Sequence, residues 1–275
     1  MLPCHSEQHA TRHENQTHLR EGIWGRGKRN FELQTYASQQ HTLDRNTVRI
    51  DVALLPGQRF DAAASVCIVV DVLRASSSIV TLLERGCERI VAAKDIAEAR
   101  RLGELLPDHL LCGEAGGLPP EGFAYGNSPV EFSRLDLTGK SAILATSNGT
   151  RILAALAEQA HAVLVGCLLN RTAVARAAVA IATERGLDVT VVASAAHAGT
   201  TFVLEDALGA AAIAAAALLA APALIASDSA RFARDAFTVA HPEITAAVRS
   251  AYHAQELVDV GLGDDVAYCA QLDVS

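Results

Sequence analysis

The stretch "VCIVVDVLRASSSIV", residues 66–80, contains both a strand signal and a helix signal. Its first five residues are apolar and mostly β-branched, which is typical of a strand buried on both faces. The apolar run ends in Asp71, and Arg74 and three serines then lead into a helical pattern. A strand that passes through a short polar turn into a helix is the repeating unit of an α/β protein. The stretch also raises a functional question, because a carboxylate stands at the end of a core strand.

The alternation of strands and helices continues along the chain. Strands are predicted for the apolar runs at 48–55, 66–71, 88–93, 109–113, 141–146, 161–166 and 188–193. Helices are predicted at 76–85, 95–106, 149–159, 171–185 and 204–220. This order predicts an α/β fold with three layers, α/β/α, and a mostly parallel or mixed sheet. Ligands of such folds bind beyond the carboxyl ends of the strands, so the loops that follow strands form the candidate site.

The composition narrows the class of protein. Half of the 275 residues are hydrophobic but only 4% are aromatic, which favours an α/β core over a β-sandwich. The net charge of −8 argues against a nucleic-acid partner. The six cysteines form no C-x-x-C pair and are expected to be buried thiols in a reducing cytoplasm. No secretory signal is visible in the polar N-terminal segment, in agreement with a cytoplasmic location.

Two segments differ from this alternating pattern. Residues 1–46 are polar and contain five of the ten histidines, so we expect a disordered extension, with a metal site as a weaker alternative. The α/β domain then covers 47–275. Residues 207–226 carry no charge and are mostly alanine. We expect them to form a buried helix packed on the sheet rather than a membrane span, although such a helix could also serve the interface of a homodimer.

Four loops that follow predicted strands are unusually polar or glycine-rich: 71–78, 113–129, 146–150 and 194–206. Three of them lead into a helix N-terminus, where free N–H groups and the helix dipole favour an anion. The hydroxyls of Ser76, Ser77 and Thr150 could add further donors. Ordinary N-capping is the alternative for any one loop. Several such loops at one edge of a sheet favour a shared anion site.

Carboxylates lie in or beside the same loops, at Asp71, Glu114, Glu205 and Asp206. Carboxylates at strand ends suit Mg²⁺, which prefers oxygen ligands and would offset the negative charge of the protein toward an anionic substrate. The alternative is that Asp71 forms a salt bridge with Arg74 and that Glu205 only stabilises its helix N-terminus. No P-loop is present, so the protein is not a Walker-type NTPase. A Rossmann dinucleotide site is not expected, because no G-x-G-x-x-G follows a strand, and no G-x-S-x-G elbow is present.

Taken together and in order, these loops resemble the 2-phosphosulfolactate phosphatase family. The resemblance rests on "DVLRASSSIV", on "GEAGG" leading to "GFAYGNSP", on "TSNGT", on "LED" and on the C-terminal stretch 250–273. It covers about 48–273 and implies a Mg²⁺-dependent phosphatase that converts 2-phospho-3-sulfolactate to 3-sulfolactate and phosphate, a step of coenzyme M biosynthesis in methanogens. One departure is Ser194-Ala195-Ala196, where the family usually has Cys-Ala-Gly.

With this reaction as the hypothesis, each loop receives a role. Arg171, Arg151 or His197 would bind the second anionic group, and either Asp71 or Glu205 would be the base. The alternatives are a Mg²⁺-dependent phosphatase for another small organic phosphate and a non-catalytic phosphoester-binding protein. The candidate catalytic residues are Asp71, Arg74, Glu114 and Glu205; the metal ligands are Asp71, Glu114 and Asp206; the substrate-binding residues are Ser76, Ser77, Asn127, Ser128, Asn148, Gly149, Thr150 and His197.

Overall fold

The computed structural model describes residues 47–197 and 199–275, and the predicted disordered extension 1–46 lies outside them. All seven predicted strands are present and every pairing is parallel. They form two sheets rather than one. The first has the order β6 (Ala162–Gly166), β2 (Ser65–Val70), β7 (Asp188–Ala193), β1 (Arg49–Ala53) and β8 (Ile225–Ala226). The second has the order β3 (Arg89–Ala93), β5 (Ser141–Ala145) and β4 (His109–Gly113).

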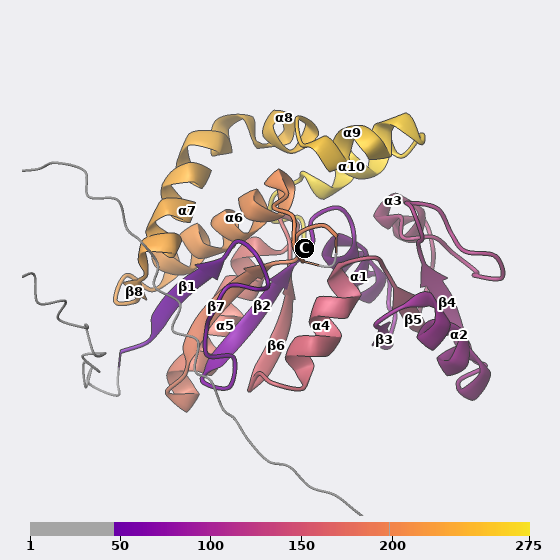
Figure 1. The fold of residues 1–275 in the computed structure, drawn as a ribbon, viewed down its shortest axis with the longest axis horizontal. Coiled ribbons are helices and arrows are strands. Elements are labelled where there is room, and N and C mark those ends of the chain that lie inside the picture. The colour runs from indigo at the N-terminus through magenta and orange to yellow at the C-terminus, as the bar shows by residue number, and fades with distance from the viewer. Residues whose placement is uncertain (1–46, 198) are drawn as a thin grey trace, which may run out of the picture. The chain divides into compact units, whose positions relative to one another are not determined.

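Helices cover both faces of each sheet (Figure 1). Side chains of α5 (Arg171–Arg185), α6 (Leu204–Ala220) and α7 (Asp228–Ala240) share one core with the outer face of the five-stranded sheet. Side chains of α1 (Ala75–Glu84) and α4 (Gly149–Ala157) pack between the two sheets. Helix α2 (Ile96–Leu105) covers the far face of the three-stranded sheet. The predicted α/β/α layering is therefore confirmed, and the two sheets share the middle helical layer.

The opening strand shows why the core has this form. All six residues of β2 are buried, and their side chains alternate between two cores. Val66, Ile68 and Val70 join the core with α5 and α6, whereas Cys67 and Val69 join the core with α1 and α4. Because neither face of this strand meets water, its sequence is continuously apolar. Asp71 therefore follows the strand at its carboxyl end, where the helical layers separate.

Residues 207–220 of the alanine-rich segment lie in the buried helix α6, whereas residues 221–226 form a turn and β8 instead of the expected helix. Ten residues of α6 are buried, and small side chains let it approach the sheet closely. A Cβ atom on Gly209 would lie 2.5 Å from Val72 Cγ2, so only glycine fits there. In the described part of the chain, no helix is long and apolar enough to cross a membrane.

The chain closes with helices that the sequence pattern did not predict. They are α7, the 3₁₀ turn His241–Glu243, α8 (Ile244–Arg249), α9 (Tyr252–Asp259) and α10 (Gly263–Cys269). A short helix that precedes β5, α3 (Pro129–Ser133), was not predicted either. Leu257 of α9 and Val266 of α10 join the core formed by α5, α6 and α7. This packing holds the C-terminal helices beside the carboxyl ends of the strands, close to α3 (Figure 1).

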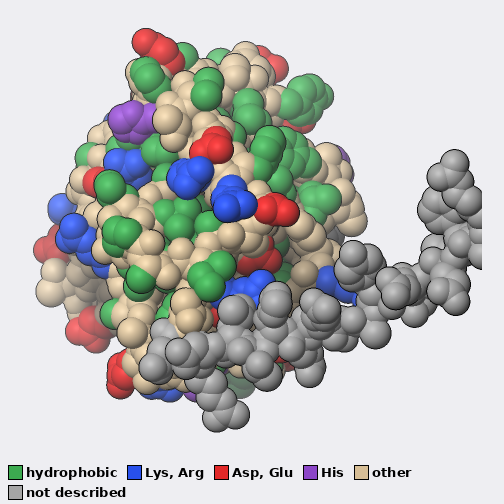
Figure 2. All heavy atoms as spheres, turned by 90° about the vertical axis from the view of Figure 1, so that its left-hand side faces the viewer, with side chains coloured by type: hydrophobic (Ala, Val, Ile, Leu, Met, Phe, Trp, Pro, Cys, Tyr) green, Lys and Arg blue, Asp and Glu red, His purple; other side chains and the backbone are tan. Residues whose placement is uncertain are grey.

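The surface carries charges of both signs. On the face shown in Figure 2, basic and acidic side chains are interspersed with hydrophobic ones. Large hydrophobic side chains are exposed on α6 and α7, namely Leu219, Phe232 and Val239.

A homodimer and the lack of a nucleic-acid partner stay predictions. The five cysteines among the described residues are all buried and free, as expected.

Candidate active site

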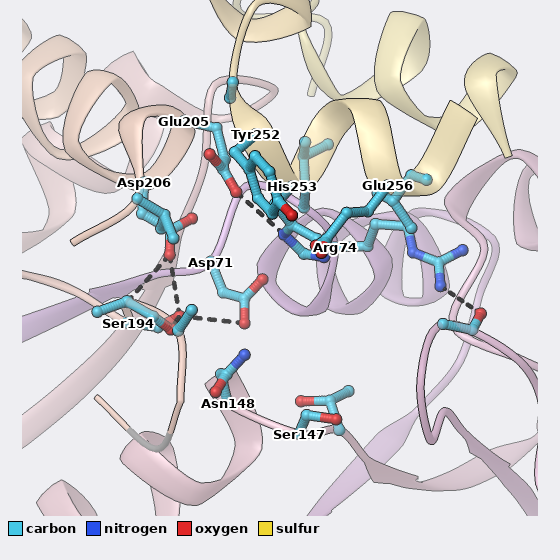
Figure 3. Close-up of a pocket in the computed structure, with 18 of the residues that line it drawn as sticks. Asp71, Arg74, Ser147, Asn148, Ser194, Glu205, Asp206, Tyr252, His253 and Glu256 are labelled. Atoms are coloured by element: carbon cyan, nitrogen blue, oxygen red, sulfur yellow. Dashed lines mark hydrogen bonds and ion pairs between the residues drawn. The ribbon is translucent and has the colours of Figure 1, made fainter. Parts of the chain in front are cut away.

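A cavity of ≈ 990 Å³ lies where the strand ends of both sheets meet the C-terminal helices. All four predicted loops line it. Asp71 follows β2 and Ser194 follows β7 in one sheet, whereas Glu114 follows β4 and Ser147 follows β5 in the other. Helix α9 closes the cavity on the remaining side through His253 and its neighbours (Figure 3). The predicted shared edge is therefore formed by two sheets.

The innermost group is a pair of buried aspartates joined by a serine. Ser194 Oγ lies 3.2 Å from Asp71 Oδ2 and 3.0 Å from Asp206 Oδ2 (Figure 3). The backbone fixes both carboxylates, because Ala75 N–H donates to Asp71 Oδ1 and Val72 N–H donates to Asp206 Oδ1. A serine hydroxyl has a single proton. It can therefore bond to both carboxyl groups at once only if one of them is protonated.

Electrostatics agrees with a shared proton at this pair. Burial raises the pKa of Asp71, and the charge of Glu114 raises it further. Burial also raises the pKa of Asp206 well above its ordinary value, and the charges of Asp71 and Glu205 add to the increase. A set of carboxylates that oppose one another's ionisation attracts a proton or a cation.

Glu205 and His253 form a second pair at the cavity wall. Glu205 is fully buried in the first turn of α6, and its Oε1 lies 3.0 Å from His253 Nδ1 (Figure 3). Its other oxygen, Oε2, is buried and has no hydrogen-bond partner among the described residues. The carboxylate therefore positions the imidazole and retains one oxygen that can accept from a ligand or bind a cation.

Glu114 joins three loops. Its Oε1 accepts from Ser147 N–H at 2.7 Å, and its Oε2 accepts from Gly117 N–H at 2.9 Å. The backbone N–H of Glu114 donates to Ala145 O at the end of β5. Both carboxylate oxygens are thus engaged with backbone donors. Glu114 holds the loops after β4 and β5 together at the cavity, beside Asp71.

Arg74 lines the cavity but does not pair with Asp71. Its Nη1 lies 2.7 Å from Asp265 Oδ2, and its Nη2 donates to Gly117 O at 2.8 Å. Both side chains of the ion pair are almost completely buried. Asp265 also accepts from Ser128 Oγ and from Val130 N–H. The charge of Arg74 is therefore already compensated, and the alternative of an Asp71–Arg74 salt bridge is wrong.

The comparisons with known proteins agree with this geometry. A family model described as 2-phosphosulpholactate phosphatase matches residues 53–275. The chain belongs to this family. A Deinococcus radiodurans protein named "Probable 2-phosphosulfolactate phosphatase" is 38% identical over 229 residues, which are 83% of this chain and 91% of that protein. Proteins with the same name are 34% identical in Carboxydothermus hydrogenoformans, over 82% of this chain and 90% of that protein, and 35% identical in Pseudothermotoga lettingae, over 82% and 92%.

Several residues predicted to bind substrate in this family member lie behind the cavity wall instead. Ser76 and Ser77 are completely buried, and their hydroxyls donate to Val69 O and Val72 O. Thr150 exchanges hydrogen bonds with Thr146 inside the loop that precedes α4. These side chains do not line the cavity, and neither does Ser128, whose hydroxyl donates to Asp265 Oδ1. They shape the loops that surround the ligand.

Other predicted residues do face the cavity, namely Asn127, Asn148, Arg151 and His197. Asn127 is buried, and its Oδ1 has no hydrogen-bond partner among the described residues, as expected for a group that waits for a ligand. Arg171 lies elsewhere: it pairs with Asp273 and stacks over Phe237.

Gly149 lets α4 approach the aspartate pair. It is buried at the first position of α4, and a Cβ atom there would lie 2.5 Å from Asp71 Oδ2. A phosphate-binding side chain is not needed to explain this residue. Its role is the close contact between the first turn of α4 and the first turn of α1.

The predicted metal ligands are brought together only in part. In residues 47–197 and 199–275, no three His, Cys, Asp or Glu side chains are gathered closely enough to form a metal site. Asp71 and Asp206 meet at Ser194 Oγ, but both oxygens of Glu114 are occupied by backbone N–H groups. Asp71, Asp206 and the free Oε2 of Glu205 still offer the oxygen-only chemistry that suits a hard cation. The predicted set with Glu114 is not assembled among the described residues, and a Mg²⁺ site stays a prediction.

Three residues of the site were missed as functional groups. Ser194 was noted only as a departure from the family pattern. His253 and Asp265 lie in the stretch 250–273, which carried part of the resemblance but contains no strand-end loop. The sequence signal that could have identified them was the residue types: a histidine, His253, and two adjacent acids, Asp264 and Asp265, near the end of the chain.

Proposed function

We propose that the protein is a Mg²⁺-dependent phosphatase that hydrolyses 2-phospho-3-sulfolactate to 3-sulfolactate and phosphate. One observation carries this proposal: all four strand-end loops line a single cavity in a member of the 2-phosphosulfolactate phosphatase family. The cavity contains two buried aspartates, Asp71 and Asp206, and burial raises the pKa of both. The family consists of phosphoric monoester hydrolases, and the curated relatives carry the name of this reaction.

The charge of the cavity supports the requirement for a metal. Five carboxylates line it, against two arginines and two histidines, and Arg74 is already paired with Asp265. A dianionic phosphoryl group would be repelled by such a lining unless a cation joined it. Asp71, Asp206 and Glu205 would hold Mg²⁺, which would supply positive charge to the phosphoryl oxygens.

Asp71 is better placed than Glu205 to accept a proton from the attacking water. Glu205 Oε1 is engaged by His253, whereas Asp71 faces the cavity and burial raises its pKa above the ordinary value. A base whose pKa lies nearer the working pH is more effective in proton transfer. Asn127 would orient the phosphoryl group through its amide, since no described residue occupies its Oδ1.

Arg151 would bind the second anionic group of the substrate. It lines the cavity from the first turn of α4, and no hydrogen bond or ion pair connects its guanidinium with another described side chain. Arg171 is outside the cavity and Arg74 is compensated. Arg151 is thus the cation in the described cavity lining whose charge is free for a sulfonate or carboxylate.

A panel of phosphoesters tests the proposal. Phosphate release would be measured for 2-phosphosulfolactate, for the matching 2-phospholactate without sulfonate, and for unrelated sugar phosphates, with Mg²⁺ and with EDTA. We expect turnover that EDTA abolishes and Mg²⁺ restores, and a preference for the sulfonated substrate that is lost in Arg151→Gln but not in Arg176→Gln, an exposed control on α5.

The outcomes separate the alternatives. If another phosphoester were hydrolysed in preference to 2-phosphosulfolactate, the assignment as a phosphatase would hold but the proposed substrate would be wrong. Ligand-induced thermal stabilisation without phosphate release would indicate the non-catalytic binding protein. Full activity after exhaustive chelation would remove the metal from the proposal.

A further inference from the structure

The cavity has an apolar side to which the proposed function assigns no role. Phe202, Leu204 and Tyr252 line it, and their exposed fractions are 49%, 39% and 81%. A single exposed hydrophobic side chain is ordinary on a protein surface and needs no explanation. Several that share one cavity with polar groups are typical of a ligand-binding site. We call these three residues the apolar subsite.

The local backbone turns Phe202 and Leu204 to the same side of the chain. Val203, which separates them, has the extended angles φ −127° and ψ 138°. Side chains two positions apart along an extended backbone lie on the same face. Both side chains therefore contribute to one surface of the cavity, just before and at the first residue of α6.

A hydrogen bond holds the first turns of α6 and α9 next to each other. Glu205 follows Leu204, and His253 follows Tyr252. Glu205 Oε1 lies 3.0 Å from His253 Nδ1, although 48 positions separate the two residues in the sequence. Figure 3 shows Tyr252 beside this pair. The aromatic ring of Tyr252 is thus added to the surface that Phe202 and Leu204 form.

The apolar subsite adjoins the part of the cavity that would hold the phosphoryl group. Leu204 and Asp206 are two positions apart in the first turn of α6, which limits the distance between their Cα atoms to about 7 Å. Asp206 is joined to Asp71 through Ser194 Oγ. A ligand whose phosphoryl group lies at the aspartate pair therefore reaches the apolar subsite with an organic group on a short spacer.

The cavity is also larger than the proposed substrate requires. Its volume of ≈ 990 Å³ lies at the upper end of the range of about 300–1,000 Å³ for pockets that enclose drug-sized ligands. 2-Phospho-3-sulfolactate is a three-carbon chain with three anionic groups, so it leaves the apolar subsite in contact with water. A ligand with an apolar group would remove this surface from water, which is favourable in proportion to the area buried.

We propose that the protein also acts on phosphate monoesters of arylalkyl alcohols, with the aromatic ring held by Phe202, Leu204 and Tyr252. Aromatic rings attract one another in edge-to-face contacts, which two of these side chains offer. Water forms the new phosphorus–oxygen bond, and the ester bond breaks with its electron pair on the alcohol oxygen, where one proton of the water ends. The products are the alcohol and inorganic phosphate. This hydrolysis rests on the phosphatase function proposed above, whereas binding of the ring does not.

Phosphonates, which cannot be hydrolysed, test the apolar subsite without catalysis. The probes are methylphosphonate and 2-phenylethylphosphonate, which carry the same charged group, and calorimetric titration in the presence of Mg²⁺ gives the two dissociation constants. One methylene group in a closed hydrophobic pocket is worth about 10–200-fold. Because the apolar subsite is partly open to water, we expect 2-phenylethylphosphonate to bind about 10–100-fold more tightly than methylphosphonate.

Matched substitutions locate this preference. Phe202→Ser should lower it below about threefold, because serine offers no ring contact. Tyr252→Ser should lower it as well, and its largely exposed side chain makes it a second variant that folds without difficulty. The control is Phe232→Ser, which removes an exposed phenylalanine from α7, outside the cavity, and should keep the preference of the wild type.

Phosphate release from ethyl phosphate and 2-phenylethyl phosphate tests the activity. Both esters release a primary alkyl alcohol, so a difference in kcat/KM reports contacts of the ring rather than the reactivity of the leaving group. We expect kcat/KM to be about tenfold or more higher for 2-phenylethyl phosphate in the wild type and in Phe232→Ser, and this ratio to fall in Phe202→Ser and Tyr252→Ser.

The outcomes distinguish the apolar subsite from the phosphatase function. If the wild type binds both phosphonates equally, or if Phe202→Ser and Tyr252→Ser keep the preference, the apolar subsite is wrong, even where 2-phosphosulfolactate is hydrolysed. If 2-phenylethylphosphonate is preferred but no phosphoester is hydrolysed, ring binding at the apolar subsite holds and the phosphatase function is overturned.

Discussion

Replacing Gly149 with alanine tests how closely α4 must approach the aspartate pair. The added Cβ would lie 2.5 Å from Asp71 Oδ2, 2.7 Å from Ala75 Cβ and 3.0 Å from Asp71 Cβ. An ordinary carbon–carbon contact needs about 3.5–4.0 Å. Because Ala75 Cβ is fixed to the backbone of α1, the first turns of α1 and α4 must separate by about 1 Å.

The size of the effect follows from two opposing terms. Overpacking a buried site costs about 1–3 kcal/mol. The better helix propensity of alanine returns at most about 1 kcal/mol, so we expect a net loss of about 1–2 kcal/mol in the free energy of unfolding. For a domain of this size that corresponds to a melting temperature about 2–8 °C lower. Displacing Asp71 by about 1 Å should also lower kcat/KM about 10²-fold.

The assay is a pair of melting curves and kinetic measurements with Gly57→Ala as control. Gly57 is exposed, and a Cβ atom there would meet nothing within 4 Å. The control should stay within about 0.5 kcal/mol of wild type. If Gly149→Ala matched Gly57→Ala in both stability and kcat/KM, the close contact between Gly149 and Asp71 would have no functional meaning.

Two further predictions concern buried charges. Asp71→Asn should abolish turnover yet raise the melting temperature in EDTA at pH 8, because the asparagine can keep the hydrogen bond from Ala75 N–H without carrying a buried charge. Since burial raises the pKa of Asp71, the stability of the wild type falls as the pH rises above the unfolded pKa of about 3.9. A gain in melting temperature that did not shrink toward pH 4 would contradict this reasoning. Asp265→Asn should lower the free energy of unfolding by about 3–5 kcal/mol, because it leaves Arg74 buried without its partner. Asp273→Asn, which removes the more exposed partner of Arg171, should lower it by at most about 1 kcal/mol. Equal melting temperatures of the two variants would show that the Arg74 pair contributes no more than a surface pair.

The sequence predicted the elements better than their assembly. The apolar runs of β2 and β5 each indicate a strand, but nothing in either run shows that the two strands belong to different sheets. Pairing depends on contacts between residues far apart in the chain. Helices α9 and α10 were missed because eight and seven residues are too few for a clear helical period. Helix α7 was also missed, although its 13 residues are long enough for one.

The candidate site was predicted by location and only partly by residue. Asp71, Asp206 and Glu205 follow strands or begin a helix, and they do meet at the cavity. Ser76 and Ser77 could not be distinguished from ligands, because a hydroxyl that closes a loop and one that binds phosphate have the same sequence signal. The partner of Glu205 could not be inferred, since His253 reaches it only through the packing of α9 on the core.

The ion pair between Arg74 and Asp265 determines the order in which parts of the newly synthesised chain can fold. The two residues are 191 positions apart, so at typical rates of synthesis Asp265 follows Arg74 by roughly 10–40 s. Both sheets are complete before then, and the guanidinium has to stay hydrated at their edge until α10 arrives. Docking of α10 and α9 then buries Arg74 and brings His253 to Glu205 in the same event. A nascent chain would therefore acquire its folded sheets first and its complete active site last.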